Sequence, residues 1–163
     1  MRHAAPPSRL THVDETGQAR MVDVTDKDVT ARTARATGKV LLSAEAITAL
    51  RDNQVPKGDA LAVARIAGIQ GAKRTPDLIP LCHPIALHGV KVELRVEDDG
   101  VFIEATTKTA DRTGVEMESL TSVSVAALTV IDMVKAIDPA AVITQVRVES
   151  KEGGKTGMWV RQQ

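Results

Sequence analysis

The stretch TGVEMESLTSVSVAALTVIDMVKAI, residues 113–137, is the part of the chain around which the fold is organised. From residue 120 onward its apolar residues recur at intervals of three and four, the spacing of one buried helix face. Thr113 and Gly114 can begin a helix, and the acids that follow suit the positive end of the helix dipole. We therefore predict a long helix over residues 115–137 that packs against the rest of the domain.

A second face of this helix is polar, and it carries Glu118, Ser122, Thr129, Asp132 and Lys135. Asp132 and Lys135 are three residues apart, so their side chains can meet on the helix surface. One interpretation is a surface ion pair, which contributes little to stability. The other is the wall of a site that supplies an acid, a base and a phosphate ligand. The helix alone does not choose between these interpretations.

Strands and helices alternate in the rest of the chain. Two runs with alternating polarity flank Asp98-Asp99-Gly100 and predict a β-hairpin. The predicted strands cover residues 20–24, 29–42, 89–97, 101–109 and 141–150, the last with Val142, Val146 and Val148 inward; the other helices cover 44–52 and 60–73, and a proline-rich irregular loop covers 75–84. The pattern β-α-β-β-α-β predicts an α+β, ferredoxin-like antiparallel sheet with helices on one face. Residues 1–10 are predicted to be a mobile tail, and residues 11–160 a single domain.

Composition narrows the classes of function. The chain has 163 residues, with 21 basic and 21 acidic residues, so a whole-protein basic field for nucleic acid is absent. Aromatic residues make up only 1%, which argues against base stacking as a binding mode. A single Cys fits a reducing compartment, and no uninterrupted apolar run approaches the length of a membrane span. We expect a cytoplasmic protein that binds neither membrane nor nucleic acid.

Several short motifs have a plain structural explanation beside a functional one. Cys82-His83 lacks the paired spacing of a zinc site, so no metal is predicted, and His83 is as consistent with packing as with catalysis. Gly154-Lys155-Thr156 resembles the end of a phosphate-binding P-loop, but Glu149 stands where that motif needs Gly. Six basic residues lie beside Gly or Pro or at element ends and would form a polyphosphate site if they converged: Arg32, Lys57, Lys73, Arg74, Lys151 and Lys155.

Specific segments resemble a known family over nearly the whole chain, from about residue 10 to residue 157. They are Lys57-Gly58-Asp59, Ala64 to Gln70, Lys73-Arg74-Thr75, Asp77 to Pro84, Thr113 to Glu118, Ala126 to Thr129 and Asp132-Met133 with Lys135. These segments are similar to those of the MoaC family, the cyclic pyranopterin monophosphate synthases of molybdenum cofactor biosynthesis. The segments Leu81 to Pro84 and Gly114 to Glu118 are the most specific of the series.

The resemblance implies a lyase that converts 3',8-cyclo-7,8-dihydro-GTP to cyclic pyranopterin monophosphate and releases pyrophosphate. It implies a homohexamer, a trimer of dimers, with sites at subunit interfaces. The implied reaction requires no cofactor, although Mg²⁺ can accompany the triphosphate. By the same resemblance Asp132, Lys135 and Lys57 are catalytic, and the substrate-binding residues are Leu81, Cys82, His83, Glu116, Met117, Glu118, Arg32, Lys73, Lys151 and Lys155.

The chain also departs from the family pattern. Asp111-Arg112 stands where Gly-Lys is common, which leaves a phosphate contact by Arg112 open, and Pro76 stands where an aromatic residue is common. Two other classes of function stay open beside the lyase. One is a nucleotide-phosphate-binding module without catalysis. The other is an assembly protein whose ion pairs only hold subunits together.

Overall fold

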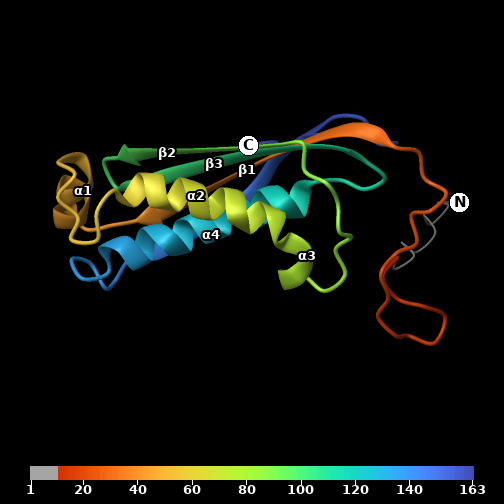
Figure 1. Ribbon diagram of the computed structural model, residues 1–163, viewed down its shortest axis with the longest axis horizontal. Coiled ribbons are helices and arrows are strands. Elements are labelled where there is room, and N and C mark those ends of the chain that lie inside the picture. Colours follow the sequence, from red (N-terminus) through yellow and green to blue (C-terminus); the bar gives the residue numbers. More distant parts are fainter. Residues whose placement is uncertain (1–10) are drawn as a thin grey trace, which may run out of the picture.

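The computed structural model describes residues 11–163, and the tail predicted over residues 1–10 lies outside the described residues. The elements are β1 (Thr30–Leu41), α1 (Ala44–Arg51), α2 (Ala60–Lys73), α3 (Thr75–Leu78), β2 (Gly89–Glu97), β3 (Gly100–Asp111), α4 (Glu116–Val134), β4 (Val142–Glu152) and β5 (Trp159–Val160). The strands form one sheet in the order β2-β3-β1-β4-β5, and α2 and α4 lie together on one of its faces (Figure 1).

The sheet topology confirms the predicted α+β, ferredoxin-like arrangement. Every paired strand is antiparallel, with β1 between β3 and β4 and the short β5 added outside β4. The two strand–helix–strand connections therefore join parallel strands that are not hydrogen-bonded neighbours. This topology brings α2 and α4 against the same face, where they cover the inner side chains of the sheet.

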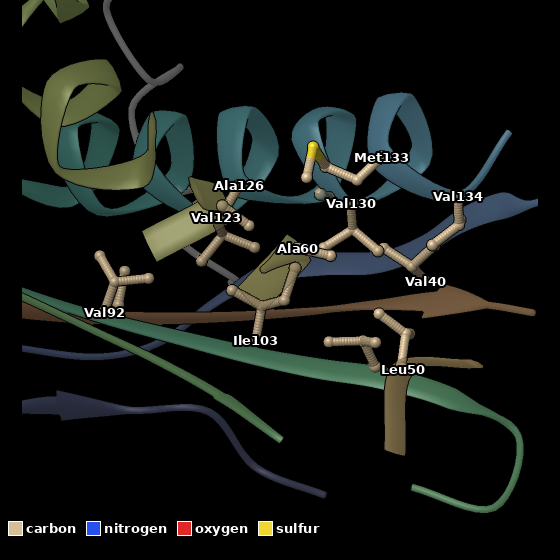
Figure 2. Packing of buried hydrophobic residues seen from close by; sticks show 14 of the residues in the cluster. Val40, Leu50, Ala60, Val92, Ile103, Val123, Ala126, Val130, Met133 and Val134 are labelled. Carbon is tan, nitrogen blue, oxygen red and sulfur yellow. The ribbon is translucent and has the colours of Figure 1, made fainter. Parts of the chain in front are cut away.

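The core is built from small and β-branched residues between the sheet and the two long helices (Figure 2). Val40 and Ile103 of the sheet and Val123 and Val130 of α4 are all fully buried. Gly38 allows α4 to approach the sheet closely, because a Cβ there would lie 2.5 Å from Val123 Cγ1. The chain has few aromatic side chains to fill space. The backbones of helix and sheet therefore lie close together, and the core is densely packed without large rings.

Helix α4 is shorter at both ends than predicted. It begins at Glu116, with Val115 at the N-cap position and no side-chain cap, and it ends at Val134. The capping role predicted for Thr113 and Gly114 is therefore wrong. In length and composition α4 could cross a membrane, and it is the one such helix among residues 11–163. More than half of it is buried in the protein, as expected of a core helix.

Three other local predictions differ from the structure. Residues 20–24 form no strand; the nearest pairing in this region is an isolated bridge between Val13 and Ala19. The proline-rich loop opens with the single turn of α3, and β5 was not predicted. Val142 is exposed rather than inward, because β4 is irregular around Gln145, whose φ is 55°, and the pairing register shifts there. Ile143 takes the inward position before this bulge and Val146 after it.

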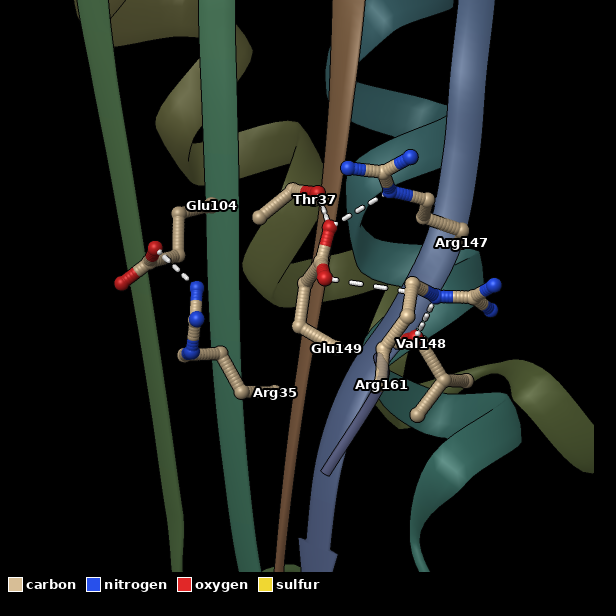
Figure 3. Close-up of polar contacts among 7 residues, drawn as sticks. All are labelled: Arg35, Thr37, Glu104, Arg147, Val148, Glu149 and Arg161. Carbon is tan, nitrogen blue, oxygen red and sulfur yellow. Dashed lines mark hydrogen bonds and ion pairs between the residues drawn. The ribbon is translucent and has the colours of Figure 1, made fainter. Parts of the chain in front are cut away.

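The opposite face of the sheet is polar and carries cross-strand ion pairs (Figure 3). Arg35 Nη1 lies 2.7 Å from Glu104 Oε2. Glu149 accepts hydrogen bonds from Thr37 Oγ1 at 2.6 Å and from Arg147 Nε at 2.7 Å. These donors lower the pKa of the Glu149 carboxyl, with Thr37 the larger cause. Arg35 and Arg147 on this face are therefore already paired with carboxylates.

Candidate active site

Two adjoining cavities lie at the N-terminal end of α4. The first, which we call the loop cavity, has a volume of about 300 Å³ and is lined by residues 81–83, 113–114 and 116–118 and by Thr11, His12, Val22, Val24 and Lys27. The second, which we call the basic cavity, has a volume of about 540 Å³ and is lined by Lys27, Asp28, Thr30, Arg32, Thr113, Gly114, Glu116, Lys151, Gly154, Lys155 and Thr156. Four residues line both cavities, so the two adjoin, and we call the pair the cleft.

The loop cavity receives its walls from the proline-rich loop and the first turn of α4. The prolines stiffen the loop, which places Leu81, Cys82 and His83 opposite Met117 and Glu118. His83 Nε2 forms a short hydrogen bond with the main-chain oxygen of Val22. Burial, and secondarily the negative charge of Glu118, raises the pKa of the Cys82 thiol. The thiol therefore stays protonated near neutral pH, which argues against Cys82 as a nucleophile.

Glu118 is the most deeply buried titratable residue in this cleft. It is only 3% exposed, and its Oε2 has no hydrogen-bond partner among the described residues. Burial raises the pKa of Glu118 to about 7, and the neighbouring charge of Glu116 adds to this rise. A carboxyl group with that pKa can give or take a proton near neutral pH, as general acid–base catalysis requires.

The basic cavity gathers cations around a glycine-rich turn. The Arg32 guanidinium lies against Gly154, where a Cβ would overlap it, and Arg32 Nε donates to the main-chain oxygen of Asp111 at 3.1 Å. Lys151 Nζ lies 3.1 Å from Glu116 Oε1. Gly154 has a φ of 77°, a backbone angle that residues with a Cβ rarely adopt. The combination of guanidinium, ammonium and glycine backbone is suited to phosphate oxygens.

A third group of charges lies at the opposite end of α4. Asp132 Oδ1 accepts from Lys135 Nζ at 2.7 Å, and Asp132 Oδ2 accepts from Lys57 Nζ at 2.9 Å. Hydrogen bonds from Lys135 and then from Lys57 lower the pKa of Asp132 to about 2. Asp132 therefore stays ionised near neutral pH, and its one carboxylate holds the two ammonium groups side by side.

Within one chain, the predicted catalytic residues are far from the cleft. Asp132 follows Glu116 by sixteen residues along α4, which at about 1.5 Å per residue is about 24 Å. The predicted binding residues do converge, with the exception of Lys73, which lies at the C-terminal end of α2 and lines neither cavity. The structure thus separates the cleft from a Lys57–Asp132–Lys135 cluster.

The sequence analysis missed residues that the cleft uses. Lys27 lines both cavities, and Thr113 and Gly114 form part of the wall between the loop and α4. The one signal for Lys27 in the sequence is its place in the polar, turn-like segment Thr25-Asp26-Lys27-Asp28, just before a predicted strand. Among residues 11–163, no group of three or more His, Cys, Asp or Glu side chains is arranged to hold a metal ion.

Comparison with known proteins assigns the chain to a family. The family model described as "MoaC family" matches residues 21–154. The chain is 71% identical, over 96% of its length and 93% of the relative's, to cyclic pyranopterin monophosphate synthase of Streptomyces avermitilis. The corresponding protein of Streptomyces coelicolor is 69% identical, over 96% and 92% of the two chains. That of a Nocardioides species is 66% identical, over 95% and 97%. The cleft and charge cluster described above therefore belong to a member of the MoaC family.

Proposed function

We propose that the protein is a cyclic pyranopterin monophosphate synthase, a lyase that converts 3',8-cyclo-7,8-dihydro-GTP to cyclic pyranopterin monophosphate and pyrophosphate. The observation that carries this proposal is the junction of the loop cavity with the basic cavity. A buried carboxyl group lies in one cavity and several cations lie in the other. This division matches a substrate with a heterocyclic end and a triphosphate end. The names of the relatives point to the same activity.

The cleft accounts for binding and for part of the chemistry. Arg32, Lys151 and Lys155 would hold the phosphates and stabilise pyrophosphate as it leaves. Glu118 would carry a proton to or from the ring atoms that rearrange. We propose that no resident cofactor takes part, because the conversion needs proton transfers and phosphate chemistry but no redox step. Mg²⁺ would enter only with the triphosphate.

We further propose that the active site is completed by a second subunit. The Lys57–Asp132–Lys135 cluster is about 24 Å along α4 from the cleft of its own chain, too far to share one small substrate. A two-fold contact that pairs the helices in opposite directions would bring each cluster to the cleft of its neighbour. Exposed apolar side chains on α2 and α4 support such a contact: Val63, Ile66 and Leu128. The assembly we propose is a homohexamer, a trimer of dimers, in the cytoplasm.

A turnover assay tests the proposed activity directly. Purified protein is incubated with freshly prepared 3',8-cyclo-7,8-dihydro-GTP, and pyrophosphate and cyclic pyranopterin are measured in the same sample, with and without EDTA. We expect both products in equal amounts, and their loss in an Asp132→Asn variant that keeps its assembly. Tight substrate binding without either product would favour the second candidate, a nucleotide-phosphate-binding module, which the cations of the basic cavity alone could support.

A further inference from the structure

The segment before β1 forms part of both cavities although it has no helix or strand of its own. Residues 11–29, which we call the N-terminal strap, pass the end of the sheet near the start of α4 (Figure 1). The strap contributes Val22 and Val24 to the loop cavity and Asp28 to the basic cavity. Its Lys27 lines both. The shape of the cleft therefore depends on where this irregular segment is held.

Within residues 11–163, two side-chain hydrogen bonds tie the strap to the body of the protein. One joins His83 Nε2 to the main-chain oxygen of Val22. The other runs from Arg112 Nε to the main-chain oxygen of Lys27, at 3.1 Å. The main-chain hydrogen bonds recorded for residues 11–29 join one strap residue to another. Arg112 thus holds the one strap residue that reaches both cavities, while Arg112 itself lines neither.

The residue before Arg112 holds a second cation of the same cavity. Asp111 ends β3, and its main-chain oxygen accepts from Arg32 Nε at 3.1 Å. The Asp111 carboxylate accepts from the main-chain N–H of Arg112 at 2.7 Å, which fixes the path of the chain between the two residues. Asp111 and Arg112 therefore connect, on one side, to Arg32 of β1 and, on the other, to Lys27 of the strap.

We propose that Arg112 is a positioning residue that fixes the strap so that Lys27 stands at the junction of the two cavities, and that Asp111 fixes Arg32 in the same way. Together they set the cations of the basic cavity for a diphosphate or triphosphate anion. The identity of that anion as part of a nucleotide rests on the proposed function. The positioning role itself concerns any polyphosphate, so inorganic pyrophosphate is a suitable probe.

The physical reason is preorganisation. A lysine on an irregular segment must lose conformational freedom when it binds an anion, and this cost lowers affinity. The Arg112 hydrogen bond removes part of that freedom before the anion arrives. Loss of the tether therefore weakens binding through Lys27, although the positive charge of Arg112 does not touch the anion. The opposing explanation is a direct attraction between the Arg112 guanidinium and phosphate.

A double-mutant cycle separates these explanations. Pyrophosphate binding is measured by titration calorimetry on the full-length protein and on Arg112→Ala, Lys27→Ala and the double variant. Each single change is expected to weaken binding about tenfold, and the double variant is expected to be within about twofold of Lys27→Ala alone. Arg51→Ala is the matched control, because Arg51 pairs with Asp98 at the far end of the sheet and should leave binding unchanged. Circular dichroism and size-exclusion chromatography verify fold and assembly.

Limited trypsin digestion measures how firmly the strap is held, and it does not depend on the charge near the anion. Cleavage after Arg20 and Lys27 in the strap should be several-fold faster in Arg112→Ala than in Arg51→Ala.

The binding cycle has outcomes that would overturn the proposal. If the two single losses of pyrophosphate affinity multiply, to about a hundredfold in the double variant, Arg112 acts on the anion itself and the proposal is wrong. Unchanged binding in Arg112→Ala or in Lys27→Ala, or no pyrophosphate binding by the unaltered protein, would overturn it as well. Should the cycle behave as expected while the synthase assay gives no product, the proposed function fails and the positioning role stands.

Discussion

The buried carboxyl group of Glu118 should cost the protein stability above acidic pH, and Glu118→Gln should recover that stability. Glutamine keeps the size and shape of the side chain but has no proton to lose. The folded protein holds the proton of Glu118 up to a pKa of about 7, whereas the ordinary value is 4.5. Between these values the folded state binds more protons than the unfolded state, so stability falls as pH rises and becomes level above pH 7.

The size of the effect follows from the same two values. Each tenfold change in proton affinity is worth about 1.4 kcal/mol, so the rise from 4.5 to about 7 corresponds to about 3 kcal/mol at pH 8. Solvent that enters the open cleft would reduce this figure, which makes it an upper value. At pH 4.5 and below, Glu118→Gln should differ little from the unaltered protein. The variant should also lose turnover, because the group that we propose exchanges the proton is gone.

Urea unfolding at fixed protein concentration, from pH 4.5 to pH 8.5, measures this prediction. A fixed concentration is needed because assembly contributes to apparent stability. Glu15→Gln is the control, since Glu15 is exposed on the strap. The stability of Glu118→Gln relative to the unaltered protein should rise with pH and level off near pH 7. Identical pH profiles for the two proteins would refute the reasoning, as would a gain of the same size in Glu15→Gln.

Three further changes test separate parts of the account. Gly38→Ala should lower the free energy of unfolding by about 1–3 kcal/mol in urea, because its Cβ would lie 2.5 Å from Val123 Cγ1; an unchanged value would mean that α4 and the sheet can separate freely. Gly114→Ala should displace the Glu116 carboxylate, which a Cβ would overlap, and raise the KM for substrate about tenfold without unfolding the protein; a KM within about twofold of normal would contradict this. The Cys82 thiol should react with iodoacetamide at pH 7.5 at least about threefold more slowly than free cysteine, because its pKa is raised; a faster reaction would show an activated thiol.

Local signals in the sequence were sufficient for most of the fold. The helices predicted over residues 44–52 and 60–73 are present, with Ser43 and Asp59 as their caps, since a capping side chain acts on a main-chain N–H only a few residues away. The hairpin of β2 and β3 was equally readable from alternation around its turn. The bulge at Gln145 was not, because a non-glycine residue with positive φ gives no pattern in the sequence. That single residue reversed the predicted direction of Val142.

Most residues that line the cleft were named from the sequence, but Lys27 was missed, Lys73 lies outside the cleft, and the geometry was predictable only in part. The hydrogen bond between Lys57 and Asp132 joins residues 75 positions apart, and no spacing rule reports such a contact. The distance between Glu118 and Asp132 was readable, because fourteen residues on one helix span about 21 Å. The interpretation that places both residues on the wall of one site did not take this length into account. The contact between Lys27 and Arg112 was hidden, because a strap without regular structure is placed by tertiary contacts alone.

The central claim, an active site shared between two subunits, is tested most directly by complementation. An Asp132→Asn variant and an Arg32→Ala variant, each inactive alone, are unfolded together in equal amounts and refolded as mixed assemblies. A shared site predicts recovery of about a quarter of normal turnover, because half of the dimers are mixed and each mixed dimer has one intact site. No recovery, with mixed assemblies demonstrated by mass spectrometry, would contradict the shared site and would mean that each chain works alone or that the cluster around Asp132 serves another purpose.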